Sequence, residues 1–101
     1  MLQLKDDDNV KTDQLCVYAL GETDVKVRRT ALDNLTIRSK RYIKFYEEVL
    51  LDDSYVNVEK ALILLTDKYP LMTEEYLNRT RHLTKENSSF KLTWLKLKFG
   101  N

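Results

Sequence analysis

The sequence contains few of the residues on which most enzyme active sites depend. Its 101 residues include one cysteine, one histidine, one proline and two glycines. A single cysteine excludes an intramolecular disulfide, and we expect Cys16 to be buried and to behave as a small hydrophobic side chain. Cys16 lies in the apolar run 15–20, the longest in the chain. A membrane span requires roughly twenty such residues, so we expect no membrane contact.

These scarcities also argue against catalysis. His82 is the only histidine, and no nucleophile motif surrounds it. The two glycines are isolated, so they form no phosphate-binding loop. Adjacent acidic residues on a helix point about 100° apart and do not converge on one atom; the adjacent pairs are Glu47/Glu48, Asp52/Asp53 and Glu74/Glu75. We therefore predict that the protein is not an enzyme and has no catalytic residue, metal ion or cofactor.

The beginning of the chain is polar and acidic. It has no apolar core segment of the kind found in signal peptides, so we expect a cytoplasmic protein. Residues 1–11 are typical of a flexible arm. At this length we expect residues 1–101 to form a single domain.

The first half of the chain has a helical pattern of apolar residues. Residues 15–20 are predicted to form a short helix capped by Thr12 or Asp13, although a buried strand would have the same pattern. The longest helical pattern covers 24–51 and begins after a potential cap at Asp24. The polar residues between Asn34 and Ser39 favour caps over helix interiors, so a break there is an alternative to one long helix.

A second pair of helices is predicted between two loops, at 52–54 and 86–89. Asn57 is the predicted cap of the first helix, and Pro70 ends it because the residue before a proline is disfavoured in the α region. Thr73 is the predicted cap of the second helix, which extends to residue 85 and has acidic residues in its first turn. The apolar face of the first helix consists of Val58, Ala61, Leu62, Leu65 and Tyr69.

The end of the chain alternates apolar and polar residues with a period of two, and the phase shifts once, as at a β-bulge. We interpret 90–101 as a strand or extended arm that pairs with segment 15–20 or with the same arm of a second chain. The predicted fold is therefore mainly α. It is a small bundle of about four helices with a helix-turn-helix-like hairpin at 57–85 and a C-terminal strand or extended arm.

Charge is distributed in zones, although the formal net charge is only +1. Residues 1–25 contain two Lys and Arg against six Asp and Glu, and residues 51–75 have the same counts. Residues 26–50 contain seven Lys and Arg against three Asp and Glu, and residues 76–101 contain six Lys and Arg against one Glu. If the two basic zones adjoin in space they form a phosphate-binding face; the alternative is that opposite zones neutralise each other.

The hairpin at 57–85 has two interpretations. In a helix-turn-helix the second helix enters the major groove of DNA. Helix 73–85 carries side chains that can donate hydrogen bonds to phosphates and base edges. A plain αα-hairpin has the same pattern without DNA. No glycine marks the turn, and Glu74 and Glu75 would repel phosphates at the end of the helix that usually meets the bases.

The stretch Val58–Leu77 resembles short helix-turn-helix proteins from mobile elements of Bacteroidetes. The resemblance lies in Leu65-Thr66, Thr73-Glu74, Leu77 and the arginines Arg79 and Arg81, and upstream in Arg41-Tyr42 and Phe45-Tyr46. Pro70-Leu71 stands where those proteins have an aromatic pair. The resemblance implies a regulator or a DNA-binding protein associated with transposition.

Two functional hypotheses follow. The first is a small DNA-binding regulator of phage or mobile-element type, with homodimers as a possible form. Its predicted contacts with double-stranded DNA are Thr73, Asn78, Arg79, Arg81, His82, Lys85, Arg28, Arg29, Arg41, Lys96 and Lys98. The second is a non-enzymatic helical protein-binding module, an inhibitor or adaptor encoded by a phage or mobile element that binds a host protein, because Tyr, Trp and Arg are common interface anchors. Its predicted contacts are Tyr42, Phe45, Tyr46, Phe90 and Trp94.

Overall fold

The computed structural model describes residues 14–37 and 40–100, and within these ranges the chain is helical with short connections and no strand. The prediction of a mainly α fold is confirmed. The predicted acidic arm 1–11 lies outside the described residues. A helical segment at 14–20 is followed by α2 (Val25–Asn34), η1 (Lys40–Tyr42), α3 (Ile43–Glu48), η2 (Val49–Leu51), α4 (Tyr55–Lys68), η3 (Pro70–Met72), α5 (Thr73–Thr80), η4 (Arg81–Lys85) and α6 (Ser88–Phe99).

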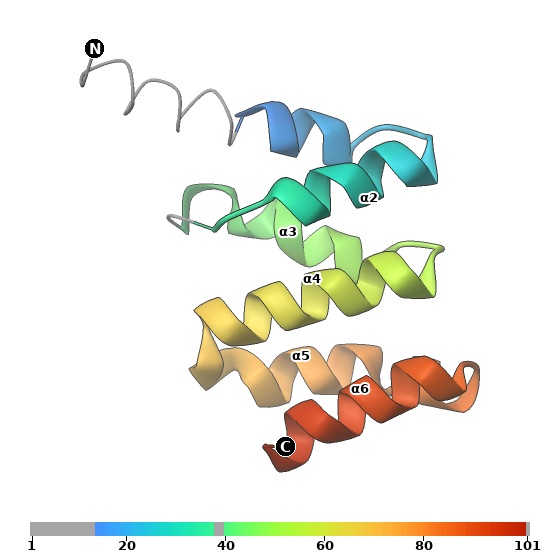
Figure 1. Ribbon diagram of the computed structural model, residues 1–101. Helices are drawn as coiled ribbons and strands as arrows, with labels where there is room; N and C mark the ends of the chain where they lie inside the picture. Colours follow the sequence, from blue (N-terminus) through green and yellow to red (C-terminus); the bar gives the residue numbers. More distant parts are fainter. Residues whose placement is uncertain (1–13, 38–39, 101) are drawn as a thin grey trace.

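The helices form a stack in chain order (Figure 1). Segment 14–20 and α2 lie at one end of the stack, and α6 lies at the other. Helix α4 is the centre, because it packs against α2, α3, α5 and α6. Its neighbour α5 runs antiparallel to it, and the short connection through Pro70 joins them at one side (Figure 1). Both interpretations of this hairpin have two helices joined by a short connection, which is what the structure shows.

The core is centred on the face of α4 that the sequence predicts. Val58, Ala61, Leu62 and Leu65 recur at helical spacing and are almost fully buried. The predicted cap of this helix, Asn57, is wrong. Ser54 is the N-cap and its Oγ accepts a hydrogen bond from the Asn57 backbone N–H at 3.3 Å. Asn57 is itself buried at the contact with α2, where its side chain accepts a hydrogen bond from Arg29 and donates one to the Val25 carbonyl.

The pattern over 24–51 is not one long helix. Asp24 is the predicted cap, and its carboxylate accepts from the Lys26 backbone N–H at 2.8 Å. Helix α2 ends at Asn34, and Leu35 and Ile37 then enter the core from an irregular segment. Of the two alternatives for this pattern, the break between Asn34 and Ser39 is confirmed, because α2 ends at Asn34 and residues 35–37 are not helical. Segment 14–20 is a helix and not the alternative strand, whereas its predicted caps lie outside the described residues.

The predicted helix 73–85 is interrupted. Helix α5 stops at Thr80 and continues as the tighter turn η4. Thr73 is not a cap, because η3 leads directly into α5 and Thr73 already has helical backbone angles, with φ −54° and ψ −48°. A capping residue has an extended backbone instead. The Thr80 hydroxyl donates to the Tyr76 carbonyl at 3.0 Å within the helix.

The C-terminal strand is the clearest error of the sequence prediction, because Ser88–Phe99 form helix α6. Asn87 caps this helix by accepting from the Phe90 backbone N–H at 2.9 Å, and Gly100 ends it in the left-handed conformation with φ 75°. The alternation arises from two interleaved helical faces. One packs on the core (Phe90, Trp94, Leu97), and the other carries the exposed Leu92 and Phe99 together with Leu95, which is half-buried and also packs against the core. The pairing of 90–101 with segment 15–20 or with a second chain's arm is therefore also wrong, and so is the loop at Ser88 and Ser89.

Candidate interaction surfaces

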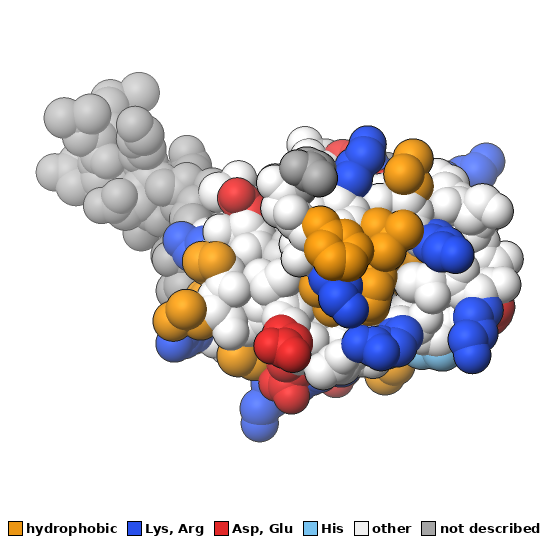
Figure 2. Space-filling view, turned by 90° about the horizontal axis from the view of Figure 1, so that it is seen from below, with side chains coloured by type: hydrophobic (Ala, Val, Ile, Leu, Met, Phe, Trp, Pro, Cys, Tyr) orange, Lys and Arg blue, Asp and Glu red, His pale blue; other side chains and the backbone are white. Residues whose placement is uncertain are grey.

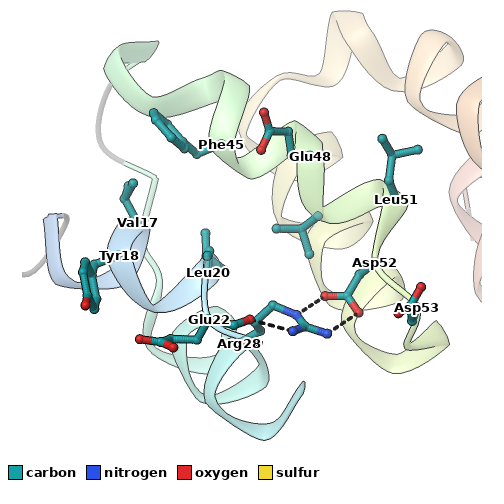
Figure 3. A pocket seen from close by; sticks show the side chains of 12 residues that line it. Val17, Tyr18, Leu20, Glu22, Arg28, Phe45, Glu48, Leu51, Asp52 and Asp53 are labelled. Carbon is teal, nitrogen blue, oxygen red and sulfur yellow. Dashed lines mark hydrogen bonds and ion pairs between the residues drawn. The ribbon is translucent and has the colours of Figure 1, made fainter. Parts of the chain in front are cut away.

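Arg28 holds the first two helices against the centre of the stack. Its Nε lies 2.6 Å from Asp52 Oδ2 and its Nη2 lies 3.2 Å from Oδ1, while Nη1 donates to the carbonyls of Glu22 and Thr23 (Figure 3). Burial alone would raise the pKa of Asp52. Hydrogen bonds from Arg28, from the Ser54 backbone and from Asn57 outweigh it and lower the pKa below its ordinary value of 3.8. Because Arg28 has these internal partners, it is not free to contact phosphates.

Arg29 is also used internally. It donates to Asn57 Oδ1 at 3.1 Å and to Ser54 Oγ at 3.2 Å, at the start of α4. Helices α4 and α5 separate this region from α6 (Figure 1). The arginines of α2 therefore do not adjoin Lys96 and Lys98, and these parts of the two basic zones do not form one face.

Arg79 belongs to a network between α3 and α5. It pairs with Glu75 at 3.4 Å and with Glu47 at 3.8 Å, and it lies over the Tyr76 ring. The Tyr76 hydroxyl donates to Glu47 Oε2 at 2.7 Å. Burial first, and then the Glu47 carboxylate, raise the pKa of Tyr76 above its ordinary value of 10.0. This network joins α5 to α3, and it partly neutralises Arg79 as a phosphate contact.

The remaining predicted DNA contacts are scattered over several elements. Thr73 is half-buried at the start of α5 and Asn78 accepts a hydrogen bond from Arg81 at 3.1 Å. His82 and Lys85 are exposed on η4. Arg41 is exposed on η1, over the Tyr42 ring. Arg81 and Lys98 come together, because they lie 5.5 Å and 5.2 Å from the centre of the Trp94 ring.

Most of the predicted protein contacts are core residues. Tyr46, Phe90 and Trp94 are buried, and the Trp94 indole N–H donates to the Leu77 carbonyl at 2.9 Å. They do not form the exposed contact surface that the sequence predicted, because their rings fill the spaces between helices. Tyr42 is half-buried and meets Phe45 edge to face, and Phe45 is half-exposed at 48 %.

The outward side of α6 combines apolar and basic residues. Leu92 is 57 % exposed and Phe99 is 67 % exposed, and between them lies Leu95, which is half-buried and also packs against the core. Lys91, Lys96 and Lys98 flank this stripe and are exposed. Figure 2 views this end of the molecule and shows a hydrophobic patch with several Lys and Arg side chains around it. We call these six residues the α6 outer face.

A groove lies near the other end of the stack, between segment 14–20 and α3 (Figure 3). Its volume is about 810 Å³. Val17, Leu20, Phe45 and Val49 provide apolar side chains, and the strongly exposed Tyr18 and Leu51 also line it. Acidic residues at its edges are Glu22, Glu48 and Asp53, against the single cation Arg28. We call this the N-terminal groove.

The comparisons with known proteins assign no family: the chain matches no family model, no curated protein and no solved structure. Within 14–37 and 40–100, no three His, Cys, Asp or Glu side chains are grouped to hold a metal ion. None of the helices described is long and apolar enough to cross a membrane.

The sequence does not predict the exposure of Leu92, Phe99 and Leu51. The pattern places Leu92 and Phe99 in a strand and Leu51 at the end of a long helix. One signal was available for α6, because Asn87 and Gly100 are a typical cap and stop on either side of it. No local signal marks the N-terminal groove, because its two walls come from separate elements.

Proposed function

We propose that this chain is a non-enzymatic, helical protein-binding module, with the α6 outer face as its contact surface. The observation that carries the proposal is the double-sided apolar character of α6. Exposed apolar patches with polar residues at their edges mark interaction sites, and on α6 Leu92 is 57 % exposed and Phe99 is 67 % exposed. Burial contributes about 25 cal/mol per Å² of apolar surface, so a partner that covers this stripe gains binding free energy.

The lysines define the chemistry of the partner. Lys91, Lys96 and Lys98 surround the apolar stripe and form no ion pair within the part of the chain that the structure describes. An apolar surface with acidic residues at its edges matches this arrangement, since charge complementarity at a rim favours the correct partner and speeds its association. We therefore infer an acidic protein surface with apolar anchors.

Affinity capture tests this function. The immobilised protein is incubated with nuclease-treated cell lysate, and retained proteins are compared between the wild type and Leu92→Asp. We expect the variant to lose the retained protein, because a carboxylate in the stripe opposes burial and repels an acidic partner. Leu71→Asp is the matched control, since Leu71 is 99 % exposed on η3 and lies outside the α6 outer face. Equal retention by wild type and Leu92→Asp contradicts the proposal.

DNA binding by a regulator of mobile-element type is the second candidate. It is favoured by the cations at the same end of the molecule, because Arg81, Lys85, Lys91, Lys96 and Lys98 make no ion pair with residues 14–37 or 40–100. A gel-shift titration tests it. We expect affinity for duplex DNA to fall by about 0.9 log units per log unit of salt for each phosphate contact, and Arg81→Ala with Lys98→Ala to weaken binding. No shift at low salt contradicts this candidate.

A further inference from the structure

We propose that the partner of the α6 outer face is the N-terminal groove of a second copy of this chain, so that molecules associate head to tail. This inference rests on the proposed function and names its partner. It follows from the presence, on one chain, of two exposed surfaces with complementary charge: an apolar stripe flanked by lysines, and a groove lined by apolar and acidic side chains.

The groove presents both apolar and charged side chains, and its apolar side chains come from two elements. Segment 14–20 contributes Val17 and Leu20 to one wall, and α3 contributes Phe45 to the other (Figure 3). Leu51 extends this surface and is 78 % exposed. A volume of about 810 Å³ leaves room for several large side chains such as Leu92 and Phe99. Covering both surfaces at once removes apolar area from water on each partner.

The charges at the two edges are opposite. Glu22, Glu48 and Asp53 lie at the groove, where the cation Arg28 is already held by Asp52. Three lysines lie at the α6 outer face. Two grooves brought together, or two α6 outer faces, would place like charges opposite each other. The electrostatics therefore favour contact between unlike surfaces.

The two surfaces do not satisfy each other within one molecule. They lie toward opposite ends of the stack, with α4 and α5 between α2 and α6 (Figure 1). A contact between different surfaces of identical chains is heterologous, and it leaves one free surface of each kind at the ends of the assembly. Association then continues beyond the dimer, as stacked helical repeats continue in a solenoid.

Sedimentation velocity over a range of protein concentrations tests the inference. At low ionic strength we expect the wild type to form dimers and then larger species as concentration rises. Salt should shift the distribution toward smaller species, because the charged edges are exposed and screened. A wild type that stays monomeric up to millimolar concentration overturns the head-to-tail inference. Lysate capture by the α6 outer face is measured separately and decides the proposed function in that case.

Two variants and their mixture test whether the α6 outer face of one molecule contacts the N-terminal groove of another. Leu92→Asp disables the α6 outer face, and Leu51→Asp disables the groove; both side chains are exposed, and circular dichroism checks that the helices are retained. We expect each variant alone to be monomeric and their equimolar mixture to form dimers only, through the intact groove of one and the intact α6 of the other. Leu71→Asp should assemble like the wild type. Self-assembly of Leu51→Asp alone, or a mixture that stays monomeric, contradicts the groove as the partner surface.

Discussion

Asp52 stabilises the fold at the residue scale. Its carboxylate lies in the connection before α4 and accepts from Arg28 of α2, from the Ser54 backbone at 2.8 Å and from Asn57 at 3.4 Å. One side chain therefore joins α2 to the start of the central helix. Because only 3 % of it is exposed, its partners cannot easily be replaced by water.

The pKa of Asp52 predicts a dependence of stability on pH. Since the pKa is lower in the folded state than its ordinary value of 3.8, the stabilisation is fully present above about pH 5 and is lost as pH falls through the folded pKa. We expect Asp52→Asn to lower the free energy of unfolding by about 2 kcal/mol at pH 7. Its melting temperature should then fall less on acidification than that of the wild type. Parallel pH profiles for the two proteins contradict this role.

The hydrogen-bond partners of Arg28 and Arg29 could not be predicted from the sequence. Both arginines lie off the apolar stripe of their helix, which is typical of solvent-exposed cations. Their partners Asp52 and Asn57 are 24 and 28 residues away. No helical period links residues at such separations, so the pairing depends on the way α2 meets α4 and is visible only in the folded chain.

At the element scale, α6 demonstrates how capping and periodicity can conflict. Two interleaved apolar faces imitate the alternation of a strand, and the alternation dominated the prediction. The caps are the better guide here, because Asn87 and Gly100 each have a specific backbone role that a strand does not need. The face of α4 was predictable for the opposite reason: one apolar stripe at helical spacing has only one interpretation.

The cap of α6 has a measurable contribution. Asn87→Ala removes the acceptor for the Phe90 backbone N–H, and we expect the free energy of unfolding to fall by about 1 kcal/mol. Ser89→Ala is the control, because Ser89 is exposed in the first turn of the same helix. Urea unfolding of both variants gives the comparison. Equal stability of Asn87→Ala and Ser89→Ala would show that the cap does not stabilise α6.

At the scale of the whole molecule, the order of the stack decides which regions are most stable. Helix α4 packs on four other helices, whereas α6 packs on α4, α5 and η4 and has an open side. Helical periodicity predicts the buried face of a helix with one apolar stripe, such as α4, but not which elements become neighbours. For that reason the sequence could identify two basic zones without showing that α4 and α5 lie between α2 and α6.

Hydrogen exchange should follow this order. At low protein concentration we expect the slowest amide exchange in the middle of α4, around Leu62 and Leu65, because both side chains are fully buried between neighbouring helices. Amides of α6 should exchange faster, since part of its surface is covered by no other helix described. Mass spectrometry of peptides from α4 and α6 measures the difference. Equal protection of both helices contradicts a stack centred on α4.

The position of Trp94 has an optical consequence. It is the only tryptophan in the chain, it lies on the inward side of α6, and its indole N–H is bound to the Leu77 carbonyl of α5. Its fluorescence therefore reports whether α6 remains attached to α5. A partner that covers the outward stripe leaves this indole hydrogen bond in place, whereas detachment of the helix exposes the ring to water and shifts its emission to longer wavelength. The protein thus carries an internal probe that distinguishes docking on α6 from unfolding of α6.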